Sequence, residues 1–125
     1  MLYKCPTSLG EIIDKITILE IKSVKFKNSD QLKFVHKEFK LLRACIGDEL
    51  SKYFSEHREL SRINNDLWEI EDQIRQHEAN NNFSSSFIRL ARSVYFKNDE
   101  RGRVKKLINE KSGSSLKEEK NYSNY

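Results

Sequence analysis

The stretch FIRLARSVYFKNDERGRVKKLIN, Phe87–Asn109, begins and ends like an amphipathic helix but is interrupted in the middle. Apolar residues recur at helical spacing at its two ends: Phe87, Leu90, Ala91 and Val94, then Val104, Leu107 and Ile108. The same three- and four-residue steps reach three polar residues between these ends: Asn98, Arg101 and Lys105. Because an unpaired charge on a core face costs several kcal/mol, the pattern predicts a compensating group. That group is a carboxylate on a neighbouring helix, water in a cleft or a bound anion.

The stretch is also basic. Residues 88–111 carry eight cationic side chains and three carboxylates, while the whole chain has a net charge of +4. This excess permits an anionic partner but does not establish one.

The composition indicates a small helical protein. A chain of 125 residues is long enough for one domain. Charged residues make up 34% and hydrophobic residues 37%, which is polar but compatible with a folded core. One proline and four glycines, among many Lys, Glu, Leu and Ile, favour helices over a sheet. We therefore predict a single all-α domain over residues 1–125, with a lead-in at residues 1–7 and a polar tail at residues 112–125.

Residue types that form disulfides or bind metals show no motif. Cys5 and Cys45 lack a CxxC spacing, so reduced thiols are expected, with Cys45 in the helical core. The three histidines are far apart, and we predict no metal site and no cofactor. No apolar run is long enough to span a bilayer, and no signal peptide is recognisable. We therefore expect a cytoplasmic protein without a membrane partner.

The first helix is predicted from Leu9 to about Phe26. Ser8 and Glu11 have the spacing of a capping box, which places its start. Its apolar residues cover most of the helix circumference rather than one stripe. A helix of this kind is surrounded by other elements, so we predict that it is central or shared across a subunit interface. The β-branched run at residues 16–21 leaves a strand as the alternative there.

Three further helices are predicted from apolar periodicity and turn residues: Gln31 to about Phe54, about Glu59 to Ala79, and Phe87 to about Lys111. Asp30 is the expected N-cap of the second helix, and Ser85 or Ser86 that of the last. Gly113 is the expected C-cap. Short loops make consecutive helices antiparallel. We predict antiparallel helical hairpins arranged like a four-helix bundle, which assemble into a dimer or a higher oligomer.

A second polar line accompanies the apolar seam of the third predicted helix: Asn64, Trp68, Glu71, Arg75 and Glu78. An antiparallel neighbour would bring this line towards the basic stretch. Arg92, Arg101 and Lys105 have the chemistry to hold a phosphate or a carboxylate. The ring of Trp68 or Tyr95 would stack on a base or a sugar.

The remaining polar residues complete the predicted pocket. Asn98 and Asn109 would read polar groups of the ligand, and Glu71 and Asp72 would orient the arginines. The candidate ligand-binding residues are Trp68, Glu71, Asp72, Arg75, Arg92, Tyr95, Asn98, Arg101, Lys105 and Asn109.

The alternative interpretation of both polar lines is a solvated surface laced with salt bridges. Catalysis is poorly supported, because Glu71 and Asp72 diverge on a helix and residues 84–86 have no partner histidine in the local sequence pattern, where helix capping is the better interpretation. Nucleic-acid binding along residues 101–106 is a rival, but acidic residues are interleaved and no known binding module is recognisable.

Four blocks of the sequence are specific enough to compare with a family: SLGEIIDKITILEIK (Ser8–Lys22), LWEIEDQIRQHE (Leu67–Glu78), FIRLARSVYFKNDERGRVKKLIN (Phe87–Asn109) and EEKNY (Glu118–Tyr122). In these blocks the chain resembles a small bacterial and bacteriophage family classed as a domain of unknown function. The resemblance covers nearly the whole chain. It implies a stand-alone small protein, encoded in some members beside surface-polysaccharide genes and in others in phage genomes.

The resemblance also implies a polar signature that ties the C-terminal tail to the site. On this sequence the signature comprises Glu11, Asp14, Lys15, Trp68, Glu71, Asp72, Arg75, Arg92, Tyr95, Asn98, Asp99, Arg101, Lys105, Asn109, Ser114, Glu119, Lys120 and Tyr122.

We predict non-enzymatic binding of a small anionic ligand, a nucleotide or a sugar phosphate. In a phage, such a protein would suit sequestration of a nucleotide signal of host immunity, because no turnover is needed. The first rival is a structural or adaptor oligomer, linked by the resemblance to surface-polysaccharide synthesis, whose polar line is a salt-bridge network across a subunit interface. Two further candidate functions are an enzyme acting on phosphorylated sugars or nucleotides and a nucleic-acid-binding protein.

Overall fold

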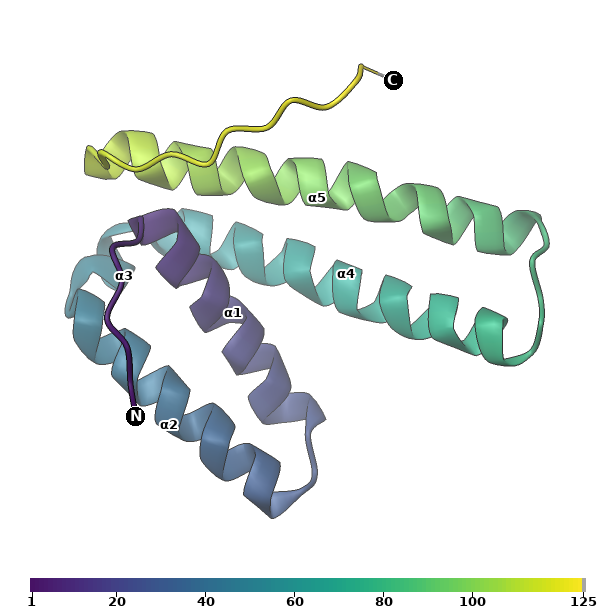
Figure 1. Cartoon of the computed structure of the whole chain (residues 1–125), viewed down its shortest axis with the longest axis horizontal. Coiled ribbons are helices and arrows are strands. Elements are labelled where there is room, and N and C mark those ends of the chain that lie inside the picture. Colours follow the sequence, from purple (N-terminus) through teal and green to yellow (C-terminus); the bar gives the residue numbers. More distant parts are fainter. Residues whose placement is uncertain (125) are drawn as a thin grey trace.

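The computed structural model describes residues 1–124, and within that range helices are the only regular secondary structure (Figure 1). The elements are α1 (Leu9–Lys25), α2 (Ser29–Ile46), α3 (Glu49–Lys52), α4 (Phe54–Ala79) and α5 (Ser85–Ser112). The all-α prediction is therefore confirmed for the described residues. Tyr125, the last residue of the predicted tail, lies outside them.

The chain forms two helical hairpins of unequal length. Figure 1 shows the α1–α2 hairpin against one end of the longer α4–α5 hairpin, whose other end projects beyond it. Contacts between α4 and α5 are the most extensive, and α1 contacts α2, α4 and α5. The prediction of a central first helix is therefore confirmed, and the apolar circumference of α1 is explained by its three neighbours.

Local signals account for most helix ends. The Ser8 Oγ accepts the backbone N–H of Glu11 at 3.4 Å and caps α1. Gly113 ends α5 in the left-handed conformation, with φ of 68°, as predicted. Asp30 as the cap of α2 was wrong, because the Asn28 side chain accepts the backbone N–H of Asp30 at 2.9 Å and that of the next residue. Ser84, one residue earlier than predicted, is the N-cap of α5.

The prediction of one continuous helix to Phe54 was also wrong. Gly47 takes a φ of 52°, which ends α2 at Ile46. The short α3 follows, and α4 begins at Phe54, so the break predicted at residues 55–58 lies inside a helix. The earlier bend places Ile46 and Tyr53 in the same apolar core.

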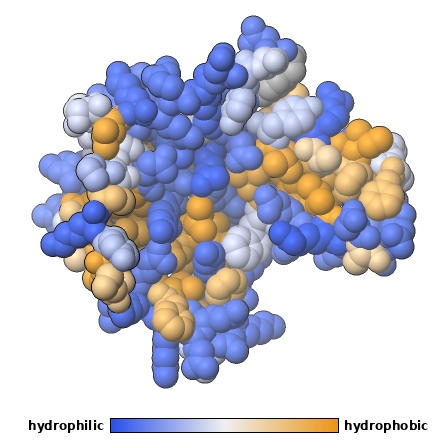
Figure 2. Space-filling model, viewed as in Figure 1, coloured by the Kyte–Doolittle hydropathy of each residue, from blue (hydrophilic) through white to orange (hydrophobic). Residues whose placement is uncertain are grey.

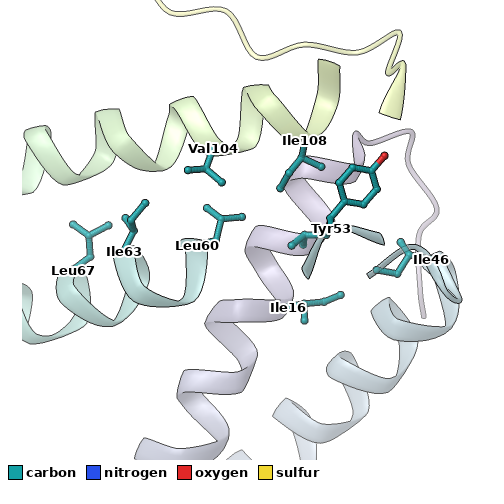
Figure 3. Close-up of a cluster of buried hydrophobic side chains, with 9 residues drawn as sticks. Ile16, Ile46, Tyr53, Leu60, Ile63, Leu67, Val104 and Ile108 are labelled. Atoms are coloured by element: carbon teal, nitrogen blue, oxygen red, sulfur yellow. The ribbon is translucent and has the colours of Figure 1, made fainter. Parts of the chain in front are cut away.

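The core lies where the two hairpins cross (Figure 3). Its buried members are Ile13, Ile16, Ile46, Tyr53, Leu60, Ile63, Leu67, Val104 and Ile108. Each large aliphatic side chain buried in this way contributes about 1.5–3 kcal/mol. No residue from 68 to 103 is buried, so the outer half of the α4–α5 hairpin lies beyond the core. Cys45 is exposed, and its prediction as a core thiol was wrong.

Within residues 1–124, none of the helices combines the length and the apolarity that crossing a membrane requires.

Candidate functional site

The interruption in the α5 stripe is compensated by a carboxylate on α1. Arg101 Nε donates to Asp14 Oδ1 at 2.8 Å, and Nη2 donates to Oδ2 at 2.5 Å. Asp14 is only 3% exposed, so this bidentate pair satisfies a carboxylate that the fold buries. The hydrogen bond to Asp14 is the main reason that the pKa of Arg101 is raised. Of the three compensating groups predicted for this position, a carboxylate on a neighbouring helix is the one present.

The same carboxylate links α1 to α4. Asn64 Nδ2 donates to Asp14 Oδ1 at 2.9 Å and to Thr17 Oγ1 at 2.8 Å. Thr17 Oγ1 in turn donates to the backbone carbonyl of Asp14 at 2.6 Å. Every buried side-chain N or O atom in the described residues has a hydrogen-bond partner. The network therefore joins three helices without an unsatisfied buried polar group.

Lys105 occupies the next turn of α5 and joins α1 to the C-terminal tail. Its side chain is 11% exposed, and Nζ lies 2.7 Å from Glu11 Oε1 and 3.1 Å from Glu118 Oε2. Burial lowers the pKa of Lys105, but the hydrogen bonds to the two carboxylates outweigh it, so the net shift is upward. The same contact with Lys105 lowers the pKa of Glu118.

Asn109 holds the start of α1 against α5. Its Oδ1 accepts the Gly10 N–H at 2.8 Å, and the residue is 5% exposed. A Cβ atom on Gly10 would lie 2.6 Å from the Lys105 carbonyl oxygen and 2.7 Å from Asn109 Oδ1. Only glycine allows this close approach of α1 to α5.

The tail runs back along α5 (Figure 1). Residues of α5 and of the tail line a cleft between them. The cleft has a volume of about 370 Å³. Its lining comprises five cationic side chains, four carboxylates, an amide, a glycine and one aromatic ring: Arg103, Lys105, Lys106, Lys117, Lys120, Asp99, Glu110, Glu118, Glu119, Asn109, Gly102 and Tyr122. Of the ten candidate residues predicted from the sequence, Lys105 and Asn109 line this cleft.

A second hollow of about 510 Å³ lies between the lead-in, α1 and α2. Asp14 and Arg101 form part of its wall, together with the Lys15–Glu38 ion pair at 2.6 Å. Arg101 and Lys105, one turn apart on α5, therefore border different hollows.

The other candidate residues lie on the outer half of the α4–α5 hairpin. Trp68 packs against Phe26, with ring centroids 6.2 Å apart, which favours a packing role. Arg92 Nε donates to the Tyr95 hydroxyl at 3.5 Å, a long contact. Nine residues separate Arg92 from Arg101, or about 14 Å along a helix. One ligand of nucleotide size would have to bridge that distance to touch both.

The carboxylates proposed to orient the arginines do not contact Arg101. Glu71, Asp72 and Arg75 are exposed on α4, and Asn98 is half-buried on α5. The carboxylate that contacts Arg101 is that of Asp14. The periodicity of α5 could not identify this residue, because it lies on another helix. Asp14 was visible only as an exception in an otherwise apolar first helix. The resemblance, by contrast, included Asp14, Glu11, Lys120 and Tyr122 in its polar signature.

Within residues 1–124, no group of three His, Cys, Asp or Glu side chains converges in a way that would hold a metal ion.

The family model described as Family of unknown function (DUF6165) matches residues 3–125. The chain belongs to this family. Membership of a family of unknown function, which the sequence blocks predicted, is therefore confirmed. No curated protein and no solved structure matches the chain. Because the family carries no assigned activity, the function has to be argued from the geometry of the clefts.

Proposed function

We propose that the protein binds a small phosphate-bearing ligand, a nucleotide or a sugar phosphate, in the cleft between α5 and the tail, without turnover. The observation that carries this proposal is the convergence of five cationic side chains from two segments on one hollow of about 370 Å³. Pockets for small ligands have volumes of about 300–1,000 Å³. The four carboxylates in the same lining disfavour a nucleic-acid backbone, which requires a continuous cationic track.

The lining residues divide into anion-binding and stacking groups. Lys106, Lys117 and Lys120 are exposed in the lining and would present their ammonium groups to a phosphate. Tyr122 is 69% exposed, and Lys120 Nζ lies 5.7 Å from its ring centroid. Its free ring surface suits a base or a sugar. Arg101 has an indirect role in this proposal, because its bond to Asp14 holds α1 against α5.

The proposal requires binding alone and assigns no catalytic role to the lining residues. Sequestration of a nucleotide signal, in a phage or elsewhere, would need only this binding.

The test is ligand binding by calorimetry and thermal unfolding with pyrophosphate, ATP, a cyclic nucleotide and a UDP-sugar. A ligand at about 100 times its dissociation constant stabilises the native state by about 2.7 kcal/mol. We expect Lys106→Gln with Lys120→Gln to weaken binding about ten-fold or more. Lys40→Gln, on the exposed surface of α2, is the matched control and should leave affinity unchanged. Absence of binding to every ligand, or an equal loss in the control, would overturn the proposal.

A structural oligomer is the second candidate, and a different observation favours it. The outer half of the α4–α5 hairpin has no buried residue, yet it carries Phe83 at 53% and Ile88 at 54% exposure. Figure 2 shows apolar side chains gathered over this projecting part. Phe83 and Ile88 expose on the order of 200 Å² together, to which Phe87, Leu90 and Val94 add their half-buried surfaces. A stable interface buries about 800 Å² per partner.

Charge favours a second copy of the chain as the occupant. In the outer half of the hairpin, α4 carries the carboxylates of Glu71, Asp72 and Glu78. The outer half of α5 carries the cations Arg89 and Arg92. Within residues 1–124 no ion pair joins these two sets, so a two-fold pairing of α4 with α5 of the partner would satisfy both.

Light scattering across a concentration series tests this second candidate. Ile88→Glu should dissociate the oligomer, whereas Val24→Glu, at an 81% exposed position on α1, should not. A monomeric native protein at every concentration would exclude the oligomer. The hydrogen bonds between Asp14 and Arg101 form within one chain. In this second candidate they therefore stabilise the fold of each subunit, and they do not form the salt-bridge network that was predicted across the subunit interface.

A further inference from the structure

The tail is held on α5 by few contacts. Beyond Ser114, the hydrogen bonds of its backbone within residues 1–124 are local ones, between Ser114 Oγ and the Leu116 N–H and carbonyl. The attachment to α5 then depends on side chains. Glu118 pairs with Lys105, and Lys120 lies over Gly102. A segment with so few backbone bonds can leave the surface at low cost.

Glu118 already places an anion in the cleft. Its carboxylate lies 3.1 Å from Lys105 Nζ, and the Lys105 side chain is 11% exposed. The carboxylate stays charged at neutral pH, because its contact with Lys105 favours the ionised form. Glu11 of α1 also pairs with Lys105 Nζ, at 2.7 Å, but only Glu118 lines the cleft. A ligand that reaches Lys105 from the cleft would therefore displace Glu118.

Gly102 indicates that the surface of α5 is shaped to receive the tail. Glycine inside a helix destabilises it by about 1 kcal/mol relative to alanine. A Cβ at this position would lie 3.2 Å from Lys120 Nζ and 3.8 Å from Lys120 Cε. The glycine thus leaves the α5 surface open where the tail crosses it.

We propose that Glu118 is a built-in competitor for the cleft, so that the cleft selects dianionic phosphate monoesters over carboxylates. This inference rests on the proposed anion-binding function. A tethered carboxylate competes at the high effective concentration of an intramolecular group. A free carboxylate of equal charge gains nothing electrostatically by replacing Glu118, and it loses translational freedom on binding. A phosphate monoester carries about −1.5 to −2 charges and gains from the exchange with Lys105 and its cationic neighbours.

Calorimetric titrations with phenyl phosphate and with acetate, at constant ionic strength, test the inference. We expect Glu118→Gln to bind the phosphate about five-fold more tightly, as the loss of a partly exposed ion pair predicts. Glu59→Gln, at an exposed position on α4 outside the cleft lining, is the control for net charge and should change the affinity less than about two-fold. In the native protein, acetate should bind at least about ten-fold more weakly than the phosphate.

The outcomes separate the two proposals. Phosphate binding that is equal in the native protein and Glu118→Gln would overturn the competitor and leave the binding function standing. An equal gain in Glu59→Gln would also overturn it, because net charge would then be the cause. Acetate binding as tight as phosphate binding would refute the selectivity. No binding by the native protein or by any variant would overturn the proposed function itself.

Discussion

Replacement of Arg101 by Met tests whether the Asp14–Arg101 pair stabilises the fold. The substitution leaves the Asp14 carboxylate, which is 3% exposed, with Asn64 as its remaining side-chain donor. Removal of one partner from a fully buried pair costs about 3–5 kcal/mol. The Arg101 side chain is 28% exposed, so water enters from that side and reduces the penalty. We therefore expect a loss of about 2–4 kcal/mol in the free energy of unfolding.

Urea unfolding followed by circular dichroism measures this loss. In thermal unfolding, a loss of about 3 kcal/mol corresponds to a fall in midpoint of roughly 10–15 °C for a chain of this size. Arg103→Met removes an exposed cation two residues further along α5 and should change stability by less than about 0.5 kcal/mol.

The double variant Asp14→Leu with Arg101→Met identifies the cause of the loss. Replacing both charges by apolar side chains removes the unpaired carboxylate, so at least about half of the lost stability should return. An Arg101→Met protein that is within about 0.5 kcal/mol of native would refute the reasoning. The same would hold if the double variant were less stable than the single one.

Two further predictions concern the contacts of α1 and α4 with the end of α5. Gly10→Ala should lower the free energy of unfolding by about 2–4 kcal/mol, because the added Cβ would lie 2.6 Å from the Lys105 carbonyl oxygen and would break the hydrogen bond between the Gly10 N–H and Asn109. Urea unfolding measures this loss, and an unchanged stability would contradict the close packing of α1 on α5. Glu56 has its pKa lowered from the ordinary 4.5 chiefly by its hydrogen bond with Lys111. Because the folded pKa lies below the unfolded one, this contribution is present above pH 4.5 and is lost as the pH falls through the folded pKa. Lys111→Met should therefore lose less stability than the native protein on acidification from about pH 5 to about pH 3, and equal losses would contradict this role of the pair.

Helices and their ends were predictable wherever the signal is local. The Ser8 cap and the Gly113 cap each depend on residues within one turn of the chain, and both predictions are confirmed. The sequence prediction put the helix break at residues 55–58 and not at Gly47, because glycine is compatible with a helix interior and the apolar spacing continues past it. In the folded chain Gly47 takes a positive φ and ends α2, and the bend that follows brings Ile46 and Tyr53 into one core.

The site was predictable in part for the same reason. Periodicity alone identified Arg101 and Lys105 as charges on a core stripe and required that something compensate them. It did not identify the compensating groups, because Asp14 lies 87 residues from Arg101 in the sequence. Which carboxylate meets which cation depends on where α1 crosses the α4–α5 hairpin.

Sequence by itself therefore determined the all-helical class, the caps at Ser8 and Gly113, the family and the presence of charges on a core stripe, since helical periodicity and capping are properties of neighbouring residues. Tertiary structure alone decided that Asp14 and Glu11 neutralise these charges and that Arg101 and Lys105 border separate hollows. It also decided that Glu118 returns along α5 to contact Lys105. These pairings arise because the two hairpins cross and the tail returns along α5. Neither the crossing nor the return of the tail produces a periodic pattern in the sequence.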